Sequence, residues 1–333
     1  MPAAVGPYSV LPLVKIFVVS LVLGLLCVPL AKGQTDTQTV AVAARLQTAL
    51  DRGGFGVGLI DGKLGVRSRN ALLDFARAQG LSEKAARARL LAEPEPPAIP
   101  YTVTQADYDE VGQAPADYLE ASAVPRMACT SLVEVLSERF HVSAPYLSRL
   151  NPAIGEWNAA VVGAAITVPN VRPPPWHPAA ARLEIDCLVF RIRAFNAAGA
   201  LVGSFPCSIA RDHARVPTGE LKLTTFAPDP NYTFDPAVFP ESRRAQEIGR
   251  KLIIPPGPNN PVGVYWISIS APGYGIHGTP HPETIGRQES HGCFRMTNWD
   301  IVTLAGMATA GTPVTVTGIL AAEPAADDTT QSP

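Results

Sequence analysis

The sequence carries little charge of either sign and few cysteines. Its 333 residues include 27 Lys and Arg against 29 Asp and Glu, and the formal net charge of −2 excludes the strong basic field of a nucleic-acid-binding protein. Proline is abundant, with 33 residues, but Pro and Gly together stay below the roughly 25–30% that is typical of low-complexity chains. The hydrophobic share of 47% is ordinary for globular proteins, so a largely disordered or collagen-like chain is excluded. The length predicts two or three domains.

One long apolar run, residues 16–30, lies near the amino terminus. Its 15 residues are fewer than the roughly 20 that a membrane-spanning helix needs. The small residues Ala31 and Gly33 fit a cleavage site before Gln34. We therefore expect residues 1–33 to be a secretory signal peptide, with an uncleaved membrane anchor as the alternative. The mature protein is then expected in the periplasm or cell envelope.

Four of the five cysteines remain after the expected cleavage, namely Cys129, Cys187, Cys207 and Cys293. If one of them is a working thiol, at most one disulfide can form within the chain. Cys187 and Cys207 flank a hairpin pattern and are the best candidates for such a pair. Two buried free thiols are the alternative, and the sequence leaves both interpretations open.

Pro-rich segments divide the mature chain into blocks. Residues 40–92 show helical apolar spacing around a DGxxG turn and predict a small α-helical bundle. Residues 93–100 (EPEPPAIP) cannot continue a helix and predict an extended linker. Residues 101–170 predict two short amphipathic helices between two strands, with an insertion at 106–130 after the first strand. His141 in this block is expected to be a packing residue.

A second Pro-rich linker, residues 171–178, leads into the third block, residues 179–320. Short alternating runs of Val, Ile, Phe and Thr, broken by Gly and Pro turns, predict a mostly β domain. Only residues 241–250 and 299–310 have helical patterns. The polar tail, residues 321–333, is expected to be disordered.

The third block holds a histidine and a cysteine in two motifs, IHGT around His277 and SHGCFRM around Cys293. A thiol is only a few per cent thiolate at neutral pH, so a nucleophilic cysteine needs an imidazole that accepts its proton. Gly292 permits the torsions with which backbone N–H groups point at one oxyanion. The motifs predict cysteine-dependent acyl transfer. The alternatives are a zinc site, with His281 and His291 as further ligands, and a buried structural thiol.

The two motifs resemble the signature of the L,D-transpeptidases of the YkuD domain family. A PTG turn at 217–219 and the stretch PPGPNNPVG at 255–263 resemble further family motifs, the second typical of the periplasmic ErfK/YbiS-like subgroup. The resemblance covers residues 179–320 and implies a YkuD-like β-sandwich with no metal or other cofactor, which disfavours zinc. Phe294 stands where Ile or Val is usual, and this departure removes no catalytic atom.

The resemblance also implies a role for each motif residue. Cys293 attacks a carbonyl in a peptidoglycan tetrapeptide stem, His277 accepts its proton, and the Gly278 carbonyl orients the imidazole. His291 and Gly292 form the oxyanion pocket with the cysteine, chiefly through backbone N–H groups. The implied substrate-contact residues are Arg295, Ser290, Thr279 and Tyr274. The alternatives are an internal salt bridge for Arg295, hydrogen bonds that hold the loop for Ser290, and packing for Thr279 and Tyr274. Trp266 is expected to pack in the core.

The implied reaction releases D-Ala and forms 3-3 cross-links or attaches an outer-membrane lipoprotein. The implied partners are stem peptides, glycan strands and such a lipoprotein, with no nucleic acid. An L,D-carboxypeptidase, with water as acceptor, and a non-catalytic cell-wall-binding protein are alternatives. The first block resembles a peptidoglycan-binding domain in RLQ at 45–47 and the DGxxG turn, with a helical spacer that binds no ligand as the alternative. The second block resembles a LysM module in LNP at 150–152. The insertion at 106–130 departs from the LysM pattern and leaves glycan binding by this block open.

Overall fold

Three helices form the first block: α1 (Lys32–Arg52), α2 (Val66–Gln79) and α3 (Glu83–Leu91). Gly80 adopts a left-handed conformation and ends α2, and the Ser82 hydroxyl accepts a hydrogen bond from the Ala85 N–H at the start of α3. The expected helical bundle is therefore confirmed.

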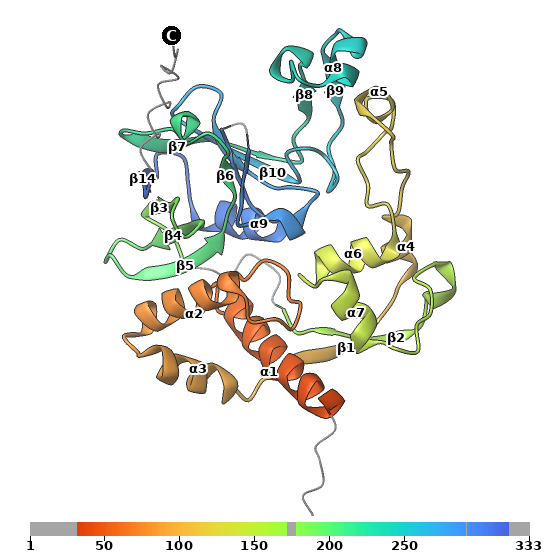
Figure 1. Ribbon diagram of the computed structural model, residues 1–333, viewed down its shortest axis with the longest axis vertical. Helices are drawn as coiled ribbons and strands as arrows, with labels where there is room; N and C mark the ends of the chain where they lie inside the picture. Colours follow the sequence, from red (N-terminus) through yellow and green to blue (C-terminus); the bar gives the residue numbers. More distant parts are fainter. Residues whose placement is uncertain (1–31, 172–177, 291, 320–333) are drawn as a thin grey trace, which may run out of the picture.

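The computed structural model describes residues 32–171, 178–290 and 292–319 (Figure 1). Three predicted segments lie wholly or mostly outside the described residues. They are the signal peptide except for its last two residues, most of the linker 171–178, and the tail.

A single buried side chain holds the DGxxG turn. The Gln47 side-chain oxygen accepts hydrogen bonds from the backbone N–H groups of Asp61 (3.1 Å) and Gly62 (2.9 Å). Its amide donates to Asp61 Oδ1 (2.8 Å) and to Ser68 Oγ (3.0 Å). Gln47 is buried, so these bonds offset the cost of removing its amide from water. The LQ and DGxxG pattern thus fixes the shape of this loop.

The second block has the expected order of strand, helices and strand. β1 (Ala98–Thr102) pairs antiparallel with β2 (Ala165–Pro169), and α6 (Leu132–Arg139) and α7 (Ala144–Leu150) lie between them in the chain. β1 begins at Ala98, so the last three residues of the expected linker 93–100 belong to a strand. An isolated two-strand pairing is weak in water, and here the strands are stabilised by the apolar side chains of α6 and α7.

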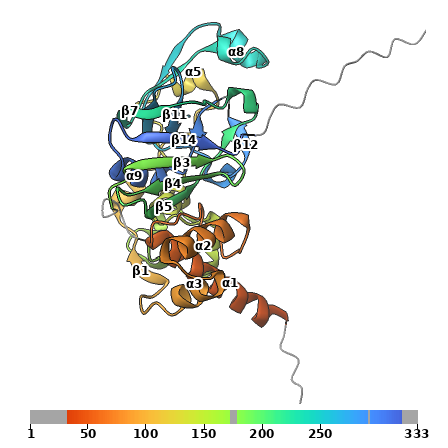
Figure 2. The same ribbon diagram turned by 90° about the vertical axis from the view of Figure 1, so that its left-hand side faces the viewer.

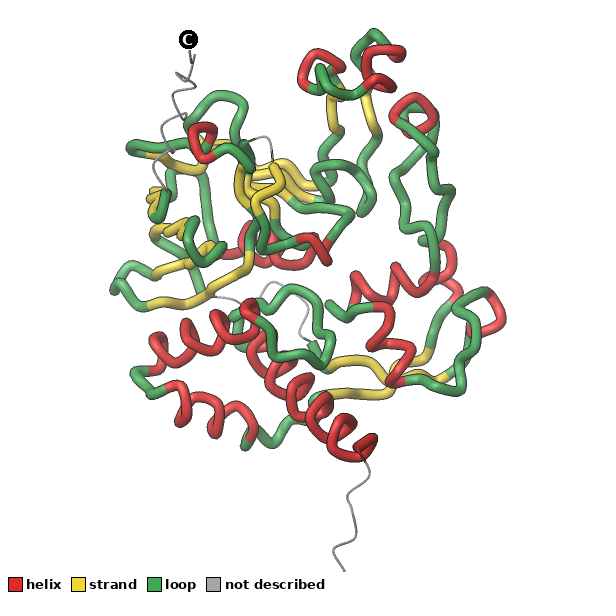
Figure 3. Tube along the Cα trace, viewed as in Figure 1, coloured by secondary structure: helices red, strands yellow, loops and turns green. Residues whose placement is uncertain are grey.

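The third block is mostly β, as expected. Figure 3 shows helices concentrated in the first two blocks and strands in the third. Eight strands form one continuous sheet in the described residues. In spatial order they are β13 (Phe294–Arg295), β11 (Gly275–His277), β10 (Tyr265–Ile269), β7 (Leu221–Pro228), β14 (Pro313–Thr317), β3 (Arg182–Asp186), β4 (Arg191–Phe195) and β5 (Leu201–Pro206). Both helices that were expected in this block are present, as α8 (Arg243–Ile248) and α9 (Asn298–Met307).

Two smaller pairs complete the third block. β6 (Ile209–Ala210) pairs with β12 (Gln288–Ser290), and β8 (Tyr232–Phe234) pairs with β9 (Leu252–Ile254). The β8–β9 hairpin carries α8 at its tip and projects from the sheet (Figure 1).

The strand pattern around the two hairpin cysteines differs from expectation. The run 183–195 is divided by a turn at 187–190 into β3 and β4, so Cys187 lies in a turn and not on a hairpin leg. The β4–β5 hairpin forms as expected, with Phe195 opposite Leu201. Cys187, Cys207 and Cys129 are all buried free thiols in the structure. Burial raises the pKa of the Cys207 thiol, which therefore stays protonated.

The three blocks pack against one another closely. β5, an edge of the large sheet, lies against α2 (Figure 2). The loop after α1 extends that edge, because Gly56 N–H donates to Ser204 O at 2.8 Å and Ser204 N–H donates to Gly54 O at 3.0 Å. Phe195 and Leu201 of the hairpin are buried in the same apolar core as the helices of the first two blocks. Burial of each such side chain stabilises the fold by about 1.5–3 kcal/mol.

A buried ionic group lies at this junction. Asp74 of α2 forms ion pairs with Arg191 (3.2 Å) and Arg193 (2.9 Å) of β4, and Ser204 Oγ donates to its carboxylate at 2.6 Å. Arg191 also donates to the Gly56 carbonyl at 3.0 Å. Arg191 and Asp74 are both buried, so removal of Asp74 leaves the Arg191 guanidinium buried without its carboxylate. This group couples the first block to the large sheet.

No helix in residues 32–171, 178–290 and 292–319 is both long and apolar enough to cross a bilayer.

Candidate active site

His277 is the last residue of β11 and is 5% exposed. Its Nδ1 lies 2.6 Å from the carbonyl oxygen of Gly278. A carbonyl only accepts hydrogen bonds, so Nδ1 carries the proton and the lone pair of the neutral ring is on Nε2. The His277 ring thus contacts the Gly278 carbonyl, the contact that the family resemblance implies, and its tautomer leaves Nε2 able to accept a proton.

Strand pairing brings the segment that follows Cys293 next to the strand of this histidine. β11 and β13 run parallel, with Ile276 opposite Phe294 and His277 opposite Arg295. Cys293 immediately precedes β13 and lies two residues before Arg295, about 7 Å along the strand direction. Arg295 lies opposite His277 in this parallel pair, so these two side chains share one face of the sheet. The Cys293 side chain is half-buried, and its Sγ lies 3.8 Å from the carbonyl oxygen of Gly273.

Burial controls the electrostatics of both groups. Desolvation lowers the pKa of His277 to about 4, and the positive charge of Arg295 adds to this, while the hydrogen bond to Gly278 opposes it. Desolvation also raises the pKa of the Cys293 thiol, against a backbone hydrogen bond from Gly275 and the charge of Arg295. Near neutral pH the pair therefore consists of a neutral imidazole and a neutral thiol. Such a pair can transfer a proton to Nε2 as a bond to sulfur forms.

Trp266 covers the imidazole, a role that the sequence did not indicate. It is the antiparallel partner of His277 on β10, and the two rings stack at a centroid distance of 5.3 Å and an angle of 14°. The indole N–H donates to Ser268 Oγ at 2.8 Å, which fixes the ring. Trp266 is half-buried, so the expectation of simple core packing is wrong. The strand alternation of Tyr265 and Trp266 indicates that one ring faces inward, but not that it faces a histidine.

The backbone before the cysteine has room only for glycine. Gly292 has a φ of 156°, and a Cβ there would lie 2.7 Å from Cε1 of Tyr274. Tyr274 therefore packs against the expected oxyanion segment. His291 lies outside the described residues, and for Ser290 only the backbone, at the end of β12, is described.

Thr279 and Arg295 have different environments. Thr279 is buried, and its hydroxyl accepts a hydrogen bond from the His281 N–H at 3.2 Å. Arg295 is half-buried, and its backbone pairs with Ser208 in both directions. Its guanidinium makes neither an ion pair nor a hydrogen bond within the described part of the chain. The internal salt bridge that was considered for Arg295 is therefore absent from these residues.

A cavity of about 540 Å³ opens beside these two residues. Thr279, Pro280 and Arg295 lie on one side of it, and the β8–β9 hairpin and the insertion of the second block lie on the others. Thr279 follows His277 by two residues and Arg295 follows Cys293 by two, so the cavity is lined by near neighbours of the candidate catalytic pair and not by His277 or Cys293 themselves.

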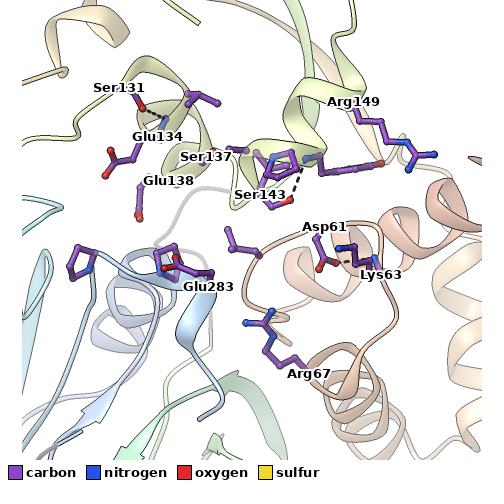
Figure 4. Close-up of a pocket in the computed structure, with 18 residues that line it drawn as sticks. Asp61, Lys63, Arg67, Ser131, Glu134, Ser137, Glu138, Ser143, Arg149 and Glu283 are labelled. Atoms are coloured by element: carbon purple, nitrogen blue, oxygen red, sulfur yellow. Dashed lines mark hydrogen bonds between the residues drawn. The ribbon is translucent and has the colours of Figure 1, made fainter. Parts of the chain in front are cut away.

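A second cavity, of about 640 Å³, lies at the junction of the three blocks (Figure 4). It contains none of the site residues predicted from the sequence. Glu134, Glu138 and Glu283 lie toward one side of it, and Lys63 and Arg149 toward the other. Apart from Glu283, its third-block residues are only Pro280 and Pro282.

Comparisons with known proteins identify the family of the third block. Residues 190–316 match the YkuD family, described as an L,D-transpeptidase catalytic domain. A "Putative L,D-transpeptidase YkuD" of Bacillus licheniformis is 26% identical over 185 residues, which cover 56% of this chain and 93% of that protein. The crystal structure of L,D-transpeptidase 3 from Mycobacterium tuberculosis aligns with a TM-score of 0.33 at 16% identity, over 49% of this chain and 76% of that one.

A relative in Fuscovulum blasticum is more similar in sequence over a shorter span. This "Putative L,D-transpeptidase in ATP synthase subunits region ORF 5" is 31% identical over 134 residues, which cover 40% of this chain and 68% of that protein. With this similarity and the matched catalytic domain, the chain belongs to the YkuD family of L,D-transpeptidases.

Proposed function

We propose that the protein is a cysteine-dependent L,D-transpeptidase that acts on peptidoglycan tetrapeptide stems. The observation that carries the proposal is the buried imidazole of His277, with Nδ1 bound to the Gly278 carbonyl, on the strand next to the one that Cys293 precedes. Family membership supports the same chemistry.

The proposed first half-reaction forms a thioester. The Cys293 sulfur attacks the carbonyl carbon at the L-centre of the stem's diamino acid while its proton moves to Nε2 of His277. Backbone N–H groups of residues 291–293 stabilise the oxyanion. Collapse of the tetrahedral intermediate breaks the bond to D-Ala, whose amine leaves with the proton from the imidazolium.

The second half-reaction consumes the thioester. An amine of a second stem attacks the acyl carbon, His277 accepts the amine proton and returns it to the departing thiolate, and a 3-3 cross-link results. A lysine of an outer-membrane lipoprotein is an alternative acceptor, and water as acceptor gives an L,D-carboxypeptidase.

The proposal extends to the rest of the chain. Residues 1–33 direct the protein to the periplasm, and the first two blocks bind glycan strands and hold the catalytic block at its substrate. The ion pairs between Asp74 and β4 support a fixed orientation of these blocks.

Product analysis tests the proposal. The full chain is incubated with a purified disaccharide tetrapeptide, alone and with an added amine acceptor, and products are identified by mass spectrometry. A transpeptidase releases D-Ala and joins the acceptor to the acyl group. Tripeptide alone in both reactions indicates a carboxypeptidase, and unchanged tetrapeptide refutes the catalytic proposal.

A further inference from the structure

The insertion of the second block reaches the catalytic block. Its segment 113–128, here called the arm, carries α5 (Tyr118–Ala121) and lies alongside the β8–β9 hairpin (Figure 1). The arm belongs in sequence to the second block, so nothing in the YkuD match at 190–316 includes it.

Backbone hydrogen bonds fix the base of the arm to the PPGPNN motif. Met127 N–H donates to Pro256 O at 2.9 Å, and Asn259 N–H donates to Met127 O at 2.9 Å. Gly257 has a φ of 144°, and a Cβ there would lie 2.2 Å from the Met127 carbonyl oxygen. Only glycine fits at this contact, so one glycine of the motif is explained by the docked arm.

Aromatic side chains and an ion pair fix the tip of the arm to the hairpin. The Tyr118 ring stacks on Phe234 with centroids 4.3 Å apart at 24°. These rings form an apolar cluster with Met127 and the buried side chains of β9. Asp117 at the start of α5 forms an ion pair with Arg244 of α8. Two separate sets of contacts thus hold the arm in one position.

The arm and the hairpin line the 540 Å³ cavity that also contacts Thr279 and Arg295, each two residues from a member of the candidate catalytic pair. Tyr118 and Met127 contribute from the arm, Phe234 from the hairpin, and Thr279 and Arg295 from the catalytic sheet. Asp117 and Arg244, which pair with each other, also line the cavity, so its apolar side chains lie together with one guanidinium, that of Arg295, that has no ion-pair partner in the described residues. A peptide with an aliphatic portion and a carboxylate is complementary to such a site.

We propose that the arm forms one wall of the donor-stem site and that Tyr118 is a specificity-determining residue. The stem lies in the cavity with a carboxylate at Arg295 and its aliphatic atoms against Tyr118 and Phe234. This inference rests on the proposed function, since the ligand is the stem of that reaction. It makes the second block part of the active site and not only an anchor.

Stem binding without turnover tests the inference. The probe is a purified disaccharide tetrapeptide, and its Kd is measured by calorimetry on the full chain carrying Cys293→Ser. Adding Tyr118→Ala raises the Kd about fivefold, whereas Tyr118→Phe keeps the stacked ring and changes the Kd less than about twofold. The matched control is Leu119→Ala, one residue along the same helix, because Leu119 is 41% exposed and does not line the cavity.

A milder substitution separates a loss of stem affinity from a loss of folded protein. Tyr118→Leu keeps an apolar side chain in the cluster but loses the stacked ring, and it raises the Kd about threefold. In the active enzyme, Tyr118→Leu raises KM by a similar factor and leaves kcat within about twofold. A structural defect alone would lower the folded fraction and kcat without moving the Kd of the folded protein.

Two results overturn the inference: equal stem affinity in the Tyr118→Leu and parent proteins when both are folded, and no stem binding by the parent protein. Failure of the proposed function is distinguishable from these results. In one case the stem binds the Cys293→Ser protein and Tyr118→Leu weakens that binding, but the enzyme with Cys293 intact releases no D-Ala. This result refutes the catalytic proposal and supports the arm as a wall of the stem site.

Discussion

Replacing Trp266 by Ala should make the reaction sensitive to pH in a range where the wild-type enzyme is insensitive. The indole stacks on His277 at 5.3 Å and helps keep the imidazole out of water. Burial lowers the pKa of His277 from 6.5 to about 4, which favours the neutral ring by about 3 kcal/mol. Loss of the indole admits water, and full solvation would return the pKa to about 6.5.

The magnitude follows from the neutral fraction of the ring. At pH 6 the wild-type imidazole is about 99% neutral, whereas a ring with the ordinary pKa is only about a quarter neutral. At pH 8 both are neutral. The ratio of the Trp266→Ala rate to the wild-type rate should therefore fall by up to about fourfold between pH 8 and pH 6.

Two measurements check this prediction. One follows D-Ala release from the tetrapeptide at both pH values, and the other follows the titration of the His277 ring by NMR. Trp266→Phe, which keeps a ring at this position, is the matched control and should show a smaller pH effect. A Trp266→Ala loss that is equal at pH 6 and pH 8, or a titration midpoint that does not rise, would refute the reasoning.

Three further predictions concern the buried groups and the cysteine loop. Burial raises the pKa of Asp300 to about 7, so its protonated form stabilises the fold below about pH 4 and this contribution is lost as pH rises through 7. Between pH 4 and pH 8, the free energy of unfolding of Asp300→Asn should therefore rise relative to wild type by up to about 4 kcal/mol in urea titrations. Parallel curves of unfolding free energy against pH would contradict this. Asp74→Ala leaves Arg191 buried without its carboxylate and should lower the free energy of unfolding by about 3–5 kcal/mol in the same assay, so a loss under about 1 kcal/mol would argue against a coupled junction. Gly292→Ala forces a Cβ against Tyr274 and should reduce D-Ala release at least about tenfold with an unchanged circular dichroism spectrum; undiminished activity would show that the loop tolerates a side chain.

The local features of the fold could be predicted from the sequence. Helical periodicity and the DGxxG turn indicated the first block, and alternation with Gly and Pro punctuation indicated the mostly β third block. The family resemblance implied the contact between the His277 ring and the Gly278 carbonyl, which joins neighbouring residues and needs no long-range contact. The division of residues 183–195 into two strands was missed because the turn at 187–190 consists of four apolar residues (CLVF) and carries no Gly or Pro to mark it.

Contacts between distant segments could not be predicted. Trp266 lies over His277 because β10 and β11 pair in one register, and alternation along a single strand does not specify its partner. The arm carries an ordinary mixture of Pro, Ala and polar residues and was identified only as an insertion. Its position depends on a hydrogen bond between Met127 and Pro256, which lie 129 positions apart in the chain. Gly257 permits this contact, but in the sequence it is only one residue of the family motif.

The most direct test of the central claim is the intact mass of the full chain after brief incubation with the disaccharide tetrapeptide. The account predicts an adduct equal to the stem minus D-Ala on the wild-type protein, located at Cys293 by peptide mapping and absent from Cys293→Ser. An adduct that persists in Cys293→Ser, or neither adduct nor D-Ala release from the wild-type protein, would contradict it.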